Sequence, residues 1–136
     1  MMQMIFTVDG EPQGKARPRF TRGGRAYTPK KTVEYERAIK NAFLAAGGTL
    51  TNLPVTVSIN AYYKIPASAT KKKAAQMMSG EILPTKKPDT DNIAKAVCDA
   101  LNGVAYHDDA QVCILHVKKN YSADPSIVVT VTEIVR

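Results

Sequence analysis

Hydrophobic and polar residues alternate in the middle of the chain, and this pattern predicts a half-buried β-strand at residues 55–63. The side chains on its apolar face are Val55, Val57, Ile59, Ala61 and Tyr63. Residues 3–8 are rich in apolar and β-branched side chains and predict a first strand. Two more strands are predicted at 111–119 and 126–135, joined by a turn at 123–125 as an antiparallel hairpin.

Apolar residues at helical spacing predict three helices. The first begins with Thr28 as N-cap and Pro29 as first helical residue, and it ends at Gly47. Its apolar face consists of Tyr35, Ile39, Ala42, Phe43 and Ala46. A short helix with a weak apolar face is predicted at 67–79, and the best-defined helix at 90–102. The apolar stripe of that last helix consists of Ile93, Val97, Ala100 and Leu101.

The segments between these elements carry Gly, Pro and basic residues without regular periodicity, and residues 14–25 and 81–88 are therefore predicted to be loops. The resulting order is strand, helix, strand, helix, helix, strand, strand. This order does not alternate regularly, so it favours an α+β fold with a mixed β-sheet and helices packed mainly on one face. The length of 136 residues suits a single domain over residues 1–136.

The composition, with 44% hydrophobic and 23% charged residues, excludes wholesale disorder and fibrous rods. The two cysteines, Cys98 and Cys113, lie in apolar runs and are interpreted as reduced core residues. The first residues have no signal-peptide pattern, and no run approaches the roughly 18 apolar residues of a membrane span. The sequence therefore predicts a cytoplasmic protein that does not bind membranes.

The formal net charge is +7, and the excess is concentrated rather than spread. Residues 15–40 hold nine basic and two acidic side chains, which equals the excess of the whole chain. Such a surface attracts nucleic acid, although a basic surface without a partner is the simpler alternative. Lys71 to Lys73 fit a solvated helix face equally well. The candidate DNA contacts are Lys15, Arg17, Arg19, Arg22, Arg25, Lys71, Lys72, Lys73, Lys86 and Lys87.

Five acids, in contrast, lie within residues 89–109. Asp89 and Asp91 stand where a loop becomes a helix, and Lys95 follows Asp91 by one helical turn. A structural interpretation is available for all three, with Asp89 as N-cap, Asp91 as dipole partner and Lys95 as its ion pair.

A second acidic pair, Asp108 and Asp109, precedes a predicted strand. One of its carboxylates would complete a three-carboxylate site suited to Mg²⁺, and the spacing does not choose between them. The alternative is a charged turn that binds no ligand. Asp99 is interpreted as a structural partner of Lys95 or as a contact to a neighbouring loop.

The segment KPDTDNIAKAVCDALNGVAYHDDAQV resembles the signature region of the RusA family of Holliday junction resolvases, small phage- and prophage-associated endonucleases. The segment GEPQGKARPRFTRGGRAYTPKKTVEYE and the last two strands resemble the same family, so the likeness covers most of the chain. The resemblance implies a dimeric, Mg²⁺-dependent enzyme of DNA recombination and repair, with Mn²⁺ as a substitute ion. Some relatives carry an arginine-rich stretch before the first aspartate, and here it is only Lys86-Lys87-Pro88.

Carried over residue by residue, the resemblance implies metal-binding acids at Asp89, Asp91 and Asp109, and a catalytic lysine at Lys95. The expected reaction is phosphodiester hydrolysis that nicks two opposing strands of a four-way DNA junction. Two alternatives remain open: a nuclease for another branched DNA, and a non-catalytic protein that binds junctions by charge.

Overall fold

A mixed four-stranded sheet lies at the centre of the structure, a computed structural model that describes residues 1–136. The strand order is β1–β6–β4–β5, where β4 pairs antiparallel with β6 and parallel with β5. The strands are β1 (Gln3–Asp9), β4 (Val55–Lys64), β5 (Val112–Ser122) and β6 (Ser126–Glu133). The mixed sheet of an α+β domain is confirmed.

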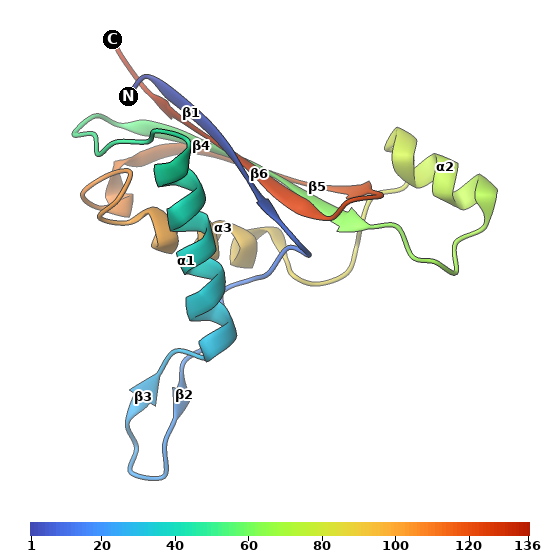
Figure 1. The fold of residues 1–136 in the computed structure, drawn as a ribbon, viewed down its shortest axis with the longest axis horizontal. Helices are drawn as coiled ribbons and strands as arrows, with labels where there is room; N and C mark the ends of the chain where they lie inside the picture. The colour runs from blue at the N-terminus through green and yellow to red at the C-terminus, as the bar shows by residue number, and fades with distance from the viewer.

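Two helices, α1 (Lys30–Ala45) and α3 (Thr90–Leu101), cover one face of the sheet and pack against each other (Figure 1). The third, α2 (Lys71–Ser79), lies beyond the end of β4, contacts β5 and contains no buried residue (Figure 1). Helices packed mainly on one face are therefore confirmed. None of the three helices combines the length and the apolar character that crossing a bilayer requires.

The core forms between that face of the sheet and the two helices. Every predicted apolar-face residue of β4 and α3 is buried, because strand and helix periodicities direct these side chains to the same layer. On α1 the residues Tyr35, Ile39 and Phe43 are buried, whereas Ala46 lies past the helix end and is exposed. Cys98 is half-buried, but Cys113 is exposed on the edge strand β5, so its assignment to the core was wrong.

Two helix starts differ from the prediction. Pro29 occupies the N-cap of α1 rather than its first helical position, so Thr28 does not cap this helix. The second helix begins at Lys71 rather than residue 67, because the Thr70 hydroxyl accepts a hydrogen bond from the Lys73 amide at 3.2 Å and caps it there.

The last two strands are both present and are joined by a short turn, but β4 lies between them. They therefore do not form the hydrogen-bonded hairpin that was predicted. The link from Ser122 to Ser126 passes the end of β4 and spans two strand spacings, about 10 Å, within the reach of four residues. β4 is thus an interior strand of the sheet, and its inward face is continuously apolar.

Residues 14–25, predicted to be a loop, contain part of a small hairpin. Its strands are β2 (Arg19–Phe20) and β3 (Ala26–Tyr27), and it projects from the body beyond the start of α1 (Figure 1). Two-residue strands are too short to show a period in the sequence, which explains why the pattern analysis missed them.

Candidate active site

Asp89 and Asp91 lie together at the N-terminus of α3. Asp89 occupies the N-cap with an extended backbone, and Asp91 lies in the first turn. The Asp89 side chain makes no capping hydrogen bond, and neither carboxylate joins an ion pair in the structure. Asp89 is therefore at the N-cap position, as the structural interpretation predicted, but its side chain does not cap the helix. Two exposed carboxylates are left free at the positive end of a helix.

Tyr63 at the end of β4 supports the loop that carries Asp89. Its hydroxyl donates a 2.6 Å hydrogen bond to the Pro88 carbonyl, within a loop where the Lys87–Pro88 peptide bond is cis. The ammonium groups of Lys86 and Lys119 lie 5.8 and 5.2 Å from the ring centroid of Tyr63. Burial, followed by the negative charge of Asp89, raises the pKa of Tyr63 to about 12, so the phenol remains a donor at neutral pH.

Lys95 extends from α3 one turn after Asp91, and its side chain is 60% exposed. Its ammonium does not pair with Asp91 but with Asp99, at 3.2 Å. The predicted Asp91–Lys95 ion pair is thus not formed, and the expectation that Asp99 is a structural partner of Lys95 is confirmed. Because Asp99 holds Lys95 from the side away from Asp91, the Asp91 carboxylate stays unpaired.

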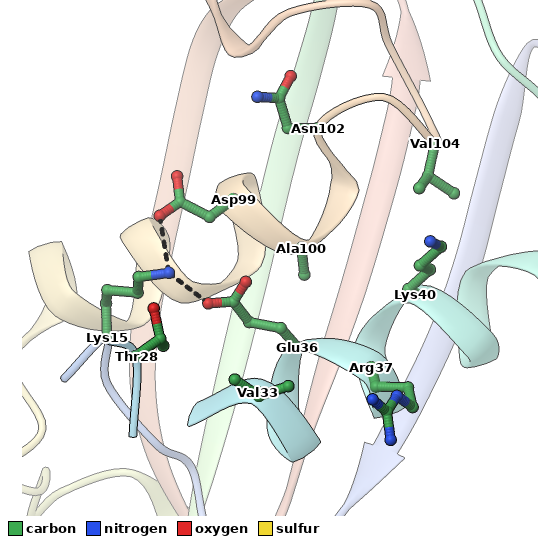
Figure 2. Close-up of a pocket in the computed structure, with 10 residues that line it drawn as sticks. All are labelled: Lys15, Thr28, Val33, Glu36, Arg37, Lys40, Asp99, Ala100, Asn102 and Val104. Atoms are coloured by element: carbon green, nitrogen blue, oxygen red, sulfur yellow. Dashed lines mark hydrogen bonds and ion pairs between the residues drawn. The ribbon is translucent and has the colours of Figure 1, made fainter. Parts of the chain in front are cut away.

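Asp99 also binds the segment that precedes the hairpin. Its second carboxylate oxygen lies 3.3 Å from the Lys15 ammonium, which pairs with Glu36 of α1 as well (Figure 2). Burial alone would lower the pKa of Lys15, but Glu36 and Asp99 outweigh it and raise the pKa above its ordinary value. Lys15 was predicted to contact DNA, yet in the structure both of its carboxylate partners belong to the chain itself.

This ion-pair group lines a pocket of about 350 Å³ between α1 and α3 (Figure 2). Arg37 and Lys40 of α1 line the same pocket. The pocket contains none of Asp89, Asp91 and Asp109, so it lies apart from the candidate carboxylates.

Asp109 opens a short 3₁₀ helix, η1 (Asp109–Gln111), with Asp108 at its N-cap. The Gln111 side chain fixes this helix, because its oxygen accepts from the Asp108 amide at 3.2 Å and its nitrogen donates to the Thr51 carbonyl at 3.0 Å. Burial first, and the charge of Asp109 among the further causes, raises the pKa of Cys98 on α3. Gln111 therefore holds the turn that carries both acids of this pair.

The three candidate carboxylates do not form one closed group. Asp89 and Asp91 lie at the start of α3, whereas Asp109 begins η1, which contacts α3. No group of three or more His, Cys, Asp and Glu side chains is close enough to hold a metal ion. A hollow of about 270 Å³ lies between α3 and β5, lined by Asp91, Ala94, Lys95, Cys98 and Leu115.

The remaining predicted basic residues are exposed but spread over three places. Arg17, Arg19, Arg22 and Arg25 lie on or beside the projecting hairpin, Lys71 to Lys73 form the first turn of α2, and Lys86 and Lys87 belong to the loop before Asp89. This last group directly precedes the start of α3 in the chain.

Sequence reasoning missed Tyr63 and Lys119 as part of this site. Tyr63 completes an apolar strand face and was assigned to the core, which is correct for its ring but not for its hydroxyl. No pattern in the sequence signals either contact, because the Pro88 carbonyl and the Lys86 backbone approach through the fold alone.

Comparison with known proteins gives two results. The sequence model of the family described as endodeoxyribonuclease RusA matches residues 9–132, a range that includes every candidate site residue. The chain is also similar to YqaN of Bacillus subtilis strain 168, described as an uncharacterized protein, with 37% identity over 137 residues and 95% of each chain covered.

Proposed function

The chain belongs to the RusA endodeoxyribonuclease family, and on that premise we propose that it resolves four-way DNA junctions by paired, symmetric nicks. Family membership implies a metal-dependent endonuclease for Holliday junctions. The observation that supports the assignment here is the unpaired state of Asp89 and Asp91 beside the exposed Lys95. The protein has a net charge of +7 and attracts DNA, but free carboxylates repel phosphates unless a cation lies between the carboxylates and the phosphate.

Carboxylate oxygens are the ligand type that suits Mg²⁺, which retains several waters, but the three side chains do not converge in this structure. We propose Asp89, Asp91 and Asp109 as its ligands, with Mn²⁺ as a substitute. Asp109 is proposed rather than Asp108 because the resemblance to the family carries the third metal ligand onto the second acid of the pair. When bound, the ion would activate water and neutralise charge on the departing oxygen.

Lys95 is proposed to stabilise the negative charge that develops on the scissile phosphate. The Lys95 side chain is exposed and lines the hollow beside β5, and its ammonium pairs with Asp99 at 3.2 Å. The loop lysines Lys86 and Lys87 would contact phosphates on either side without reading bases.

A four-way junction has approximate two-fold symmetry and must be cut in two opposing strands. A homodimer with one site in each subunit matches that symmetry, so we propose that the active form is a dimer.

The test uses an immobile four-way junction labelled on each strand, with wild-type protein and Asp91→Asn, in Mg²⁺ and in EDTA. Wild type is expected to make paired symmetric nicks only with Mg²⁺. Asp91→Asn is expected to bind as tightly or more tightly and to cut at least about 100-fold more slowly, because one charged ligand is lost. Binding by both proteins without cutting, in Mg²⁺ and in Mn²⁺, would contradict the proposal.

That contrary result would favour the second candidate, a protein that binds branched DNA without cutting it. The observation on its side is that the three carboxylates do not form one group in the structure. Nicking of flaps or replication forks in preference to four-way junctions would instead identify a nuclease for another branched DNA.

A further inference from the structure

The projecting hairpin, named here the arm (residues 17–27), has no structural task in the core. Every one of its residues is exposed. Its own turn holds it together, with the Thr21 amide donating to the Arg25 carbonyl at 2.9 Å and the Gly24 amide to the Thr21 carbonyl at 3.0 Å. An ordered segment that contributes nothing to the core suggests a partner outside the chain.

The arm has two unlike faces. Side chains alternate along a strand and directly paired residues share a face. The pair Arg19 and Tyr27, continued by Arg25, therefore forms a basic face. The opposite face consists of Phe20 and its partner Ala26, which is too small to cover the ring. Phe20 is 69% exposed as a result.

The charge of the arm indicates what covers Phe20. No acidic residue occurs between Glu11 and Glu34, and none of the arm's arginines takes part in an ion pair in the structure. A second copy of this chain would meet the arm with a net charge of +7, whereas a nucleic acid complements it. An aromatic ring among arginines is the combination that stacks on bases while cations hold the backbone.

Base faces are hidden inside a continuous duplex and become accessible only where stacking is interrupted, as at a branch point. The ring of Phe20 therefore suits a branch, and the arginines suit any DNA. One face of the arm would thus recognise the branch, and the other would bind DNA of any structure.

The base of the arm is fixed to the helix that carries the candidate site. The Lys15 amide donates to the Asn92 carbonyl at 3.0 Å, and the Lys15 ammonium binds Asp99. Gly14 packs so closely that an added Cβ would lie 2.8 Å from the Cβ of Asn92. A nucleobase stacked on Phe20 would consequently lie at a fixed distance from Asp91 and Lys95.

We propose that the arm recognises the branch point, with Phe20 stacking on an exposed base face and Arg19, Arg22 and Arg25 holding the surrounding phosphates. That this contact also sets the position of the cut rests on the proposed function. That the arm binds the branch point does not.

The test measures binding in EDTA, so that no cleavage intervenes. Wild type and Phe20→Ala are titrated with a four-way junction, carrying 2-aminopurine beside the branch, and with a linear duplex of the same sequence. Phe20→Ala is expected to weaken junction binding about tenfold, change duplex binding less than about twofold and abolish the fluorescence change at the branch. Arg22→Ala is expected to weaken both substrates in parallel.

Ile5→Ala is the matched control, because Ile5 is a 58% exposed apolar residue on β1, away from the arm, and its loss should alter neither affinity. Equal affinities of wild type and Phe20→Ala for the junction would overturn the proposal, as would a parallel loss on both substrates. A change of oligomeric state in Phe20→Ala would overturn it too, and would identify the ring as a contact between copies.

These outcomes are independent of the nuclease proposal. If wild type fails to cut but Phe20→Ala loses junction selectivity, the arm inference holds and the proposed catalysis fails. If wild type cuts and Phe20→Ala retains full selectivity, only the arm inference fails.

Discussion

Tyr63 shows how a single residue can serve both core and site. Its ring is buried at the end of β4, and its hydroxyl reaches the Pro88 carbonyl, one residue before Asp89. The alternation of residues 55–63 predicted the burial of the ring, because facing depends only on strand period. It could not predict the hydrogen bond, because Pro88 is 25 residues away in the chain.

Replacing Tyr63 by Phe removes this hydrogen bond while keeping the ring. We expect Tyr63→Phe to lower the free energy of unfolding by about 1 kcal/mol and to slow metal-dependent cleavage several-fold, because the loop before Asp89 loses its support. Urea unfolding and junction cleavage measure the two effects. Tyr62→Phe, which removes a hydroxyl from the other face of β4, should change stability by less than about 0.5 kcal/mol. An equal effect of both substitutions would contradict the assigned contact.

The same residue predicts a dependence on alkaline pH. The pKa of Tyr63 is raised to about 12 in the folded state, against about 10 in an unfolded chain, so its contribution to stability is complete below pH 10 and is lost as the pH rises toward 12. Unfolding measured between pH 9 and pH 12 should show a weaker pH dependence in Tyr63→Phe than in wild type. Equal slopes of unfolding free energy against pH in the two proteins would show that the pKa of Tyr63 is not raised in the folded state.

At the scale of elements, Gly14 and Lys15, which precede the arm in the chain, connect it to α3. Gly14 lies against Asn92, and the neighbouring Lys15 connects α3 to α1 through Asp99 and Glu36. The basic composition of residues 14–25 predicted an exposed phosphate-binding segment. The structure changes that picture for Lys15 alone, because only a packed neighbour could supply its two carboxylates.

Gly14→Ala tests this junction between elements. The added Cβ would lie 2.8 Å from the Asn92 Cβ, so the backbone must shift, and we expect a loss of about 1–3 kcal/mol in stability together with reduced junction cleavage. Denaturant titration and cleavage of the labelled junction give the two values. Gly23→Ala at the tip of the arm is the control, since its nearest atom is 3.9 Å away and no strain follows. A neutral Gly14→Ala would show that the arm is not held against α3.

At the scale of the whole molecule, the proposed dimer makes a prediction about the number of cuts. A mixed dimer of one wild-type and one Asp91→Asn subunit, purified through a different tag on each, should nick one strand of each junction and fail to resolve it. The physical reason is that each subunit would supply one site for one of two symmetric strands. Strand-specific labels on the junction distinguish single from paired nicks. Failure of the two tags to co-purify, or paired cuts by the mixed species, would contradict the dimer.

The sequence alone determined the strands and helices that are long enough to show a hydrophobic period, and it determined which of their faces are buried. It also determined the separation of basic and acidic segments and the family. These features depend on neighbours within a few residues, or on a motif that is continuous along the chain. Only the tertiary structure decided that β4 separates β5 from β6, that Lys95 pairs with Asp99 instead of Asp91, and that Phe20 and Arg19 face opposite ways. Each of these depends on which of several compatible partners lies adjacent in space, and a period specifies a face without naming the neighbour that covers it.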